Sequence, residues 1–229
     1  MFERLLSENK STIEAYCQHR FNQQLYDGSL PREAFMWFLR QDATYLRAYA
    51  KVLEKISQRL ESENSQFAEL FKRFQKETIQ AELGINQEYF RRSPLSFFSH
   101  QEATTPVIVA YIKHLTDTAE KGTIAEAITA CYPCFLLYFK LGEQNKNCPP
   151  NNEYRTWTAF YSDPTFVESM QLITAALKKL LEPISEPASQ QRIVDAFSKS
   201  AGFEVAFCDA ALESGNTAKD EAGWRCNIL

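Results

Sequence analysis

Hydrophobic residues recur every three or four positions along nearly the whole chain, which is the period of helices that bury one face. Short segments rich in glycine, proline or polar residues interrupt this pattern, and the Val/Ile/Thr alternation typical of strands is absent from the sequence. Prolines in first turns and glycines after last turns mark several boundaries. The chain is therefore predicted to be all-α. The expected helices cover about residues 2–26, 31–60, 67–92, 106–120, 124–141, 154–161, 164–181 and 187–212.

Two of these helices carry a carboxylate inside their apolar stripe. Asp42 interrupts the stripe of helix 31–60, and Glu204 interrupts that of helix 187–212. A carboxylate in an apolar environment is costly unless it is paired or protonated, and burial raises its pKa, as a general acid at neutral pH requires. Each acid could instead form a salt bridge with an Arg or Lys, or lie on a wetter edge. Two such acids in one small chain favour a functional site.

A third candidate is Cys134, in the middle of the apolar helix 124–141. Pro133 cannot donate to the carbonyl of Thr129, so a kink is expected beside the cysteine. A cysteine next to a kink could serve as a nucleophile, although buried cysteines are more often inert. Cys131 and Cys134 form a C-x-x-C pair, but a zinc site needs a second pair and a thioredoxin-like site needs a strand before the helix.

The ten tyrosines are numerous for one core. Side chains with an apolar ring and a polar tip suit a flat ligand that forms hydrogen bonds, and ordinary helix packing accounts for several of them. The tyrosines considered for a pocket are Tyr45, Tyr49, Tyr111, Tyr132, Tyr138, Tyr154 and Tyr161.

Composition narrows the class of protein. A chain of 229 residues that is 45% hydrophobic and 24% charged fits one globular domain with a self-sufficient core. The net charge of −4 gives no electrostatic footprint for nucleic acid or an anionic membrane. Neither an apolar leader nor a membrane span is expected from the sequence. The six scattered cysteines are expected to be free thiols in a reducing cytoplasm.

The C-terminal end becomes polar, which predicts a helical domain over 1–214 and a polar tail over 215–229. Cys226 is fourth from the end, as in a C-a-a-X box, and the final leucine would favour geranylgeranylation. The residues before it are not polybasic, and one lipid is a weak anchor. Chance occurrence is therefore favoured over attachment to a membrane.

Several short blocks, in order, resemble the TenA or thiaminase II family over most of residues 15–210. Each block is weak alone, but the series is specific. The blocks are His19–Phe21, Gly28–Leu30, Gln41–Asp42 with Tyr45–Leu46, Tyr111 with Leu115, Pro133–Cys134 with Tyr138, Tyr154 with Trp157 and Tyr161, and Glu204 with Phe207.

The resemblance implies a single-domain, heme-oxygenase-like bundle of about eight helices that usually forms a homotetramer. It implies hydrolysis of thiamin, or of 4-amino-5-aminomethyl-2-methylpyrimidine, to 4-amino-5-hydroxymethyl-2-methylpyrimidine for thiamin salvage, with no metal or cofactor. Cys134 would be the nucleophile, Glu204 the acid and base, and Asp42 the contact to the aminopyrimidine edge. The pocket would be lined by Tyr45, Tyr111, Tyr138 and Tyr161.

The chain departs from the family pattern at three places. Ala43 stands where an aromatic residue is frequent, Cys208 stands where tryptophan is expected, and the stretch 82–101 matches poorly. These departures concern the shape of the pocket and the choice of substrate more than the chemistry.

Two other readings remain open. A heme or di-metal relative is disfavoured because the chain has only three histidines, no G-x-x-x-G among its glycines, and no clear cluster of histidines and carboxylates. A non-catalytic pyrimidine-binding or regulatory protein of the same fold would not need the nucleophile Cys134.

Overall fold

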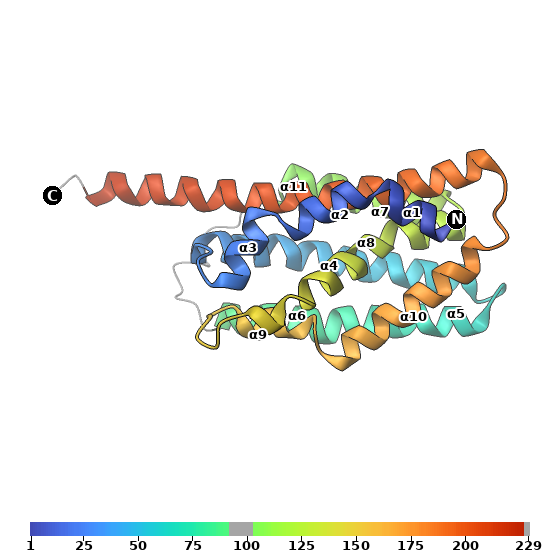
Figure 1. Cartoon of the computed structure of the whole chain (residues 1–229), viewed down its shortest axis with the longest axis horizontal. Coiled ribbons are helices and arrows are strands. Elements are labelled where there is room, and N and C mark those ends of the chain that lie inside the picture. Colours follow the sequence, from blue (N-terminus) through green and yellow to red (C-terminus); the bar gives the residue numbers. More distant parts are fainter. Residues whose placement is uncertain (92–102, 227–229) are drawn as a thin grey trace.

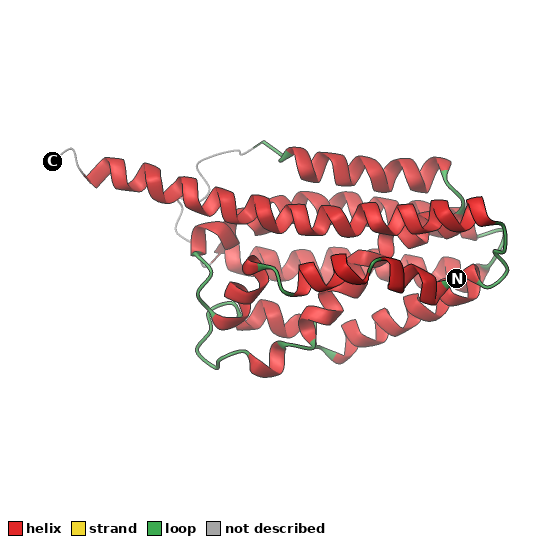
Figure 2. Ribbon diagram, turned by 45° about the horizontal axis from the view of Figure 1, so that its top comes forward, coloured by secondary structure: helices red, strands yellow, loops and turns green. Residues whose placement is uncertain are grey.

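The computed structural model describes residues 1–91 and 103–226, and these residues form helices and connecting segments without a strand (Figure 2). The predicted all-α fold is confirmed. The helices are α1 (Phe2–Glu8), α2 (Lys10–Cys17), α3 (Arg20–Asp27), α4 (Arg32–Leu60), α5 (Ser65–Glu77), α6 (Leu83–Arg91), α7 (Pro106–Lys121), α8 (Ile124–Gly142), α9 (Arg155–Phe160), α10 (Pro164–Leu181) and α11 (Pro187–Cys226), with a π-helical turn η1 (Thr78–Glu82) and a 3₁₀ turn η3 (Asn145–Asn147).

The apolar helix α8 lies at the centre of the bundle. It packs against α11, α10, α7 and α4, and most of its side chains are buried. By length and composition alone the segment 124–147 could cross a membrane, but most of its apolar window is buried inside the bundle, as in a core helix. Figure 1 shows α11 along one side and α5 with α10 along the other. The residues between these layers form the core.

The start of α8 shows why the sequence defines it well. The Thr123 hydroxyl accepts a hydrogen bond from the Glu126 backbone N–H, and the Glu126 carboxylate accepts one from the Thr123 N–H. This reciprocal capping box satisfies two donors that a helix start leaves unpaired. The helix then continues through Pro133 to Gly142.

Three predicted helices differ from the structure. The segment 2–26 forms α1, α2 and α3. Asn9 separates α1 from α2, and the extended backbone of His19, whose ring caps α3, separates α2 from α3. The segment 67–92 is divided by η1, and the last helix continues to Cys226 instead of ending near residue 212. A polar segment without proline can extend a helix, so polarity alone did not mark its end.

The C-terminal end of α11 projects beyond the other helices (Figure 1). The division at 214 between a domain and a tail stays a prediction. Residues 227–229, which complete the C-a-a-X box after Cys226, lie outside the described residues.

Candidate active site

The seven residues expected at a site come from five places in the bundle and meet in its interior. Each is buried, with at most 8% of its surface exposed. They are Asp42 and Tyr45 on α4, Tyr111 on α7, Cys134 and Tyr138 on α8, Tyr161 directly after α9, and Glu204 on α11.

Glu204 is a buried acid held by a phenol. It is 3% exposed, and the Tyr111 hydroxyl donates a hydrogen bond to its Oε1 over 2.9 Å. Burial raises the pKa of Glu204 to about 8, the negative charge of Asp42 contributes to the rise, and the Tyr111 bond opposes it. Glu204 therefore carries a proton at neutral pH.

Asp42 is the second buried acid. It is 5% exposed, and the side-chain amide of Asn86 on α6 donates to its Oδ2 over 2.7 Å. Burial raises the pKa of Asp42 to about 7, and the Asn86 bond opposes the rise. No basic side chain among the described residues contributes to the pKa of Asp42 or Glu204. Neither acid therefore forms, with the residues that the structure describes, the salt bridge considered as an alternative.

The two cysteines of the C-x-x-C pair differ in their surroundings. Cys134 lies close enough to Tyr45 and Tyr111 for a thiolate there to raise the pKa of both phenols. Cys131 has no exposed surface, and burial alone raises the pKa of its thiol. Of the two, Cys134 is the thiol that neighbours the other candidate site residues.

The four tyrosines that were expected to line the pocket form two aromatic pairs. The rings of Tyr45 and Tyr111 are 4.8 Å apart between centroids, and those of Tyr138 and Tyr161 are also 4.8 Å apart. Burial chiefly raises the pKa of Tyr45, Tyr111 and Tyr138, and the charge of Glu204 adds to each rise, which places this acid near both pairs.

The other tyrosines that the sequence offered make structural contacts. The hydroxyl of Tyr49 donates to the Cys131 carbonyl, that of Tyr154 donates to the Leu30 carbonyl, and that of Tyr132 bonds with Thr174. These contacts tie helices together.

Sequence reasoning missed several polar neighbours of the site. Asn86 bonds directly to Asp42, and the Tyr16 ring lies 6.1 Å from that of Tyr138. Cys208, which departs from the family pattern, is 1% exposed, and burial and then the charge of the nearby Glu204 raise the pKa of its thiol. Neither a lone asparagine nor a tyrosine at an apolar position gave a signal for chemistry.

The described histidines make structural contacts. His19 Nε2 lies 3.0 Å from the Asp209 carboxylate, and His114 Nε2 lies 3.2 Å from the Ala196 carbonyl. His100 lies outside the described residues. Within the described part of the chain, no three His, Cys, Asp or Glu side chains gather as a metal-binding group.

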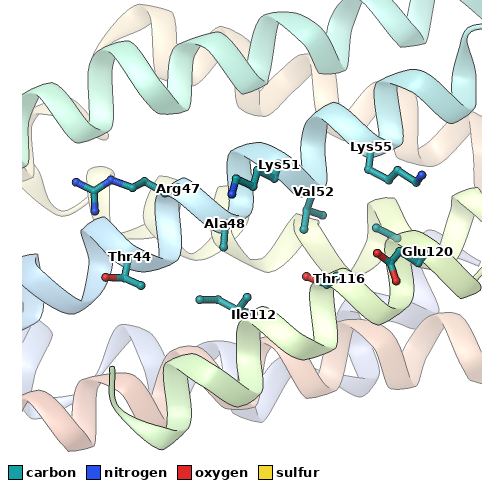
Figure 3. Close-up of a pocket in the computed structure, with 10 residues that line it drawn as sticks. Thr44, Arg47, Ala48, Lys51, Val52, Lys55, Ile112, Thr116 and Glu120 are labelled. Carbon is teal, nitrogen blue, oxygen red and sulfur yellow. The ribbon is translucent and has the colours of Figure 1, made fainter. Parts of the chain in front are cut away.

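A surface groove of about 540 Å³ lies between α4 and α7 (Figure 3). Arg47, Lys51 and Lys55 line it, and these residues are on the side of α4 that faces away from Asp42 and Tyr45. This groove is therefore separate from the buried acids.

Comparisons with known proteins identify a family and several relatives of this chain. A model of the TENA/THI-4/PQQC family matches residues 7–214. A protein from Haemophilus influenzae is 29% identical over 223 residues, which cover 93% of this chain and 99% of that protein. An aminopyrimidine aminohydrolase from Halalkalibacterium halodurans is 26% identical over 203 residues, which cover 86% of this chain and 89% of that protein.

The fold is also that of a solved structure. A TenA homologue from P. horikoshii superimposes with a TM-score of 0.77 at 24% identity, covering 93% of this chain and 98% of the homologue. At this identity the likeness shows the fold. The family match spans most of the chain and confirms the resemblance of the sequence blocks. The chain belongs to the TENA/THI-4/PQQC family.

Proposed function

We propose that this chain hydrolyses the C–N bond at the pyrimidine methylene of 4-amino-5-aminomethyl-2-methylpyrimidine or of thiamin, giving 4-amino-5-hydroxymethyl-2-methylpyrimidine for thiamin salvage. The observation that carries the proposal is that two buried acids, Asp42 and Glu204, share one region with Cys134 and the paired tyrosines. The aminopyrimidine aminohydrolase relatives from two organisms support the same reaction class.

Asp42 binds the aminopyrimidine edge, because a carboxyl group offers the hydrogen bonds that a ring nitrogen and an amino group need. The ring lies between the aromatic pairs Tyr45–Tyr111 and Tyr138–Tyr161. Aromatic walls stack on a flat heterocycle and exclude water from it.

The Cys134 thiol loses its proton to water, Glu204 supplies a proton to a ring nitrogen, and the thiolate forms a bond to a ring carbon. The ring then expels ammonia from the protonated aminomethyl group, or the thiazole of thiamin, from the methylene, and the leaving group takes the electron pair of the broken C–N bond. Water adds at the methylene and gives a proton to the ammonia or to solvent, the thiolate leaves the ring and is reprotonated, and the ring nitrogen returns its proton to Glu204. A pKa of about 8 keeps Glu204 protonated before the first step.

The direct experiment incubates the purified protein with each substrate and follows the hydroxymethyl product by chromatography with mass detection. We expect product from the aminomethylpyrimidine, from thiamin, or from both. Binding of the pyrimidine without any product would contradict the proposal and indicate a non-catalytic pyrimidine-binding protein.

We also propose that the protein works as a cytoplasmic homotetramer whose partner is the small-molecule pyrimidine. The homotetramer follows from the resemblance to the family. The location follows from the cysteines, since Cys17, Cys131, Cys134, Cys148 and Cys208 form no disulfide, as is usual in a reducing compartment. Light scattering coupled to size exclusion tests the assembly: a mass near four chains supports it, and a monomer contradicts it.

A further inference from the structure

Asn86 is a buried polar residue of α6. It is 2% exposed, whereas its neighbours Gln87 and Glu88 are exposed. Its Nδ2 donates to Asp42 Oδ2 over 2.7 Å. A buried amide needs a hydrogen-bond partner, and here that partner is a candidate ligand-binding acid.

The π-helical turn η1 rotates α6 so that Asn86 points toward α4. In an uninterrupted helix continuing from the buried residues Phe74 and Thr78, the next inward positions would include Ile85. A π-turn adds one residue, which rotates the following helix by about 100° and moves the inward position from 85 to 86. Ile85 is indeed only partly buried. Such turns are frequent at functional sites.

We propose that Asn86 is a positioning residue that holds the proton of Asp42 on Oδ1 and so sets the orientation in which the pyrimidine ring binds. This inference rests on the proposed function. Oδ2 already accepts the Asn86 N–H, and protonating that oxygen would weaken the bond. The neutral carboxyl therefore presents Oδ1–H as a donor, and Oδ2 keeps a second lone pair as an acceptor.

This donor and acceptor are complementary to one edge of a 4-aminopyrimidine. The ring nitrogen accepts from Oδ1–H, and the adjacent amino group donates to Oδ2. Turning the ring over would place the amino group against Oδ1–H, where two donors would oppose each other. Because the reacting methylene is attached beside the amino-bearing carbon, the orientation decides which wall of the pocket that methylene faces. Asn86 acts through Asp42 without touching the reacting atoms.

The direction of the Asn86 bond has a measurable consequence. Glu204 on α11 and Tyr138 on α8 are described ionisable groups whose pKa values respond to the charge of Asp42, and Asn86 is an amide that faces Asp42 from α6. An amide that donates to the carboxylate lowers the pKa of Asp42, so its removal raises that pKa. An amide that accepted the acid proton would have the opposite effect.

The test is a carboxyl ¹³C NMR titration of the protein without substrate, with the Asp42 signal assigned by its loss in Asp42→Asn. The variants are Asn86→Leu and the smaller Asn86→Ala, with Asn86→Gln as the conservative variant and Gln87→Leu as the exposed control. We expect the midpoint of Asp42 to rise by roughly one pH unit in the first two variants. It should stay near the wild-type value in the other two. An unchanged or lowered midpoint in both Leu and Ala variants would overturn the inference.

A second readout connects Asn86 to catalysis. In Asn86→Leu and Asn86→Ala, the limb of the pH profile of kcat/KM that reports the ionisation of Asp42 should move to higher pH, together with the midpoint of the titration. In Asn86→Gln this limb should lie at its wild-type pH. A limb that stays in place would overturn the link to substrate orientation. If the wild-type protein hydrolyses neither substrate, the proposed function fails, while the titration still decides the direction of the Asn86 bond.

Discussion

Two buried carboxyl groups are held by neutral hydrogen-bond donors in this core. Tyr111 donates to Glu204, and Asn86 donates to Asp42. Neutral donors stabilise the ionised forms less than a guanidinium or ammonium would, so desolvation dominates and both acids titrate near neutral pH. Acids with such pKa values can gain and lose protons near neutral pH.

At the residue scale, Glu204→Gln should reduce kcat by roughly 100-fold with a smaller change in KM, because glutamine keeps the size of the side chain but cannot release a proton. The pH profile of kcat/KM should lose one limb, which lies near pH 8 in the wild type. Steady-state kinetics across the pH range measures both. Near-normal turnover with an unchanged profile would remove Glu204 from the mechanism.

Asp42→Asn separates ligand binding from stability. The substitution removes a desolvated charge above pH 7, so the melting temperature at pH 8 should hold or rise. Affinity for 4-amino-5-hydroxymethyl-2-methylpyrimidine, measured by calorimetry, should fall by about tenfold or more, because the amide N–H is a weaker donor to the ring nitrogen than the acid O–H and cannot transfer its proton to the ring. A lower melting temperature with unchanged pyrimidine affinity would make Asp42 a structural residue instead.

The sequence identified some of these residues and could not identify others. Asp42 and Glu204 stood out because each interrupts an apolar stripe, and Cys134 because of its proline neighbour. Asn86 did not stand out, because η1 changes the helix register before it and periodicity assumes a constant register. Their roles in binding and catalysis stay predictions.

At the element scale, the helix boundaries were predicted well where a capping residue or a proline marks them in the sequence. The Thr123 capping box and the prolines at the starts of α7 and α10 agree with the predicted starts of these helices. The break between α2 and α3 was missed because His19 caps a helix through its ring nitrogen, which is not a usual N-cap signal. Only the folded backbone shows such a cap.

Thr123→Ala should lower the free energy of unfolding by about 1 kcal/mol, because it removes the acceptor of the Glu126 backbone N–H. Thr105→Ala is the matched control: Thr105 caps α7 by position, but its side chain makes no capping bond. Its effect should stay within about 0.5 kcal/mol. Chemical denaturation measures both variants, and equal losses would contradict the capping account. Hydrolysis should be unchanged in either variant.

At the scale of the whole molecule, the folded protein keeps Asp42 and Glu204 protonated at pH values at which the unfolded chain has already released these protons. The ordinary pKa values of Asp42 and Glu204 are near 4, and in the folded protein they are about 7 and about 8. The stabilising contribution of the two neutral carboxyls is complete below about pH 4, because the unfolded chain is then protonated as well. It is lost as the pH rises through the folded values.

The free energy of unfolding of the wild type relative to the Asp42→Asn/Glu204→Gln double variant should therefore fall between about pH 4 and about pH 8, by several kcal/mol in total. Urea denaturation of both proteins at several pH values measures this difference, in which the other titrating groups cancel. A flat or rising difference would show that the two carboxyls are not held neutral in the folded protein.

Hydrolysis of 4-amino-5-aminomethyl-2-methylpyrimidine by three proteins tests the central claim most directly. The three are the wild type, Cys134→Ser and Cys131→Ser, with thermal unfolding as a check on folding. We predict that the wild type releases the hydroxymethyl product, that Cys131→Ser keeps most of this activity, and that Cys134→Ser loses nearly all of it, because a serine hydroxyl is a far weaker nucleophile than a thiolate. Retained activity in folded Cys134→Ser, or loss only in Cys131→Ser, would contradict the account.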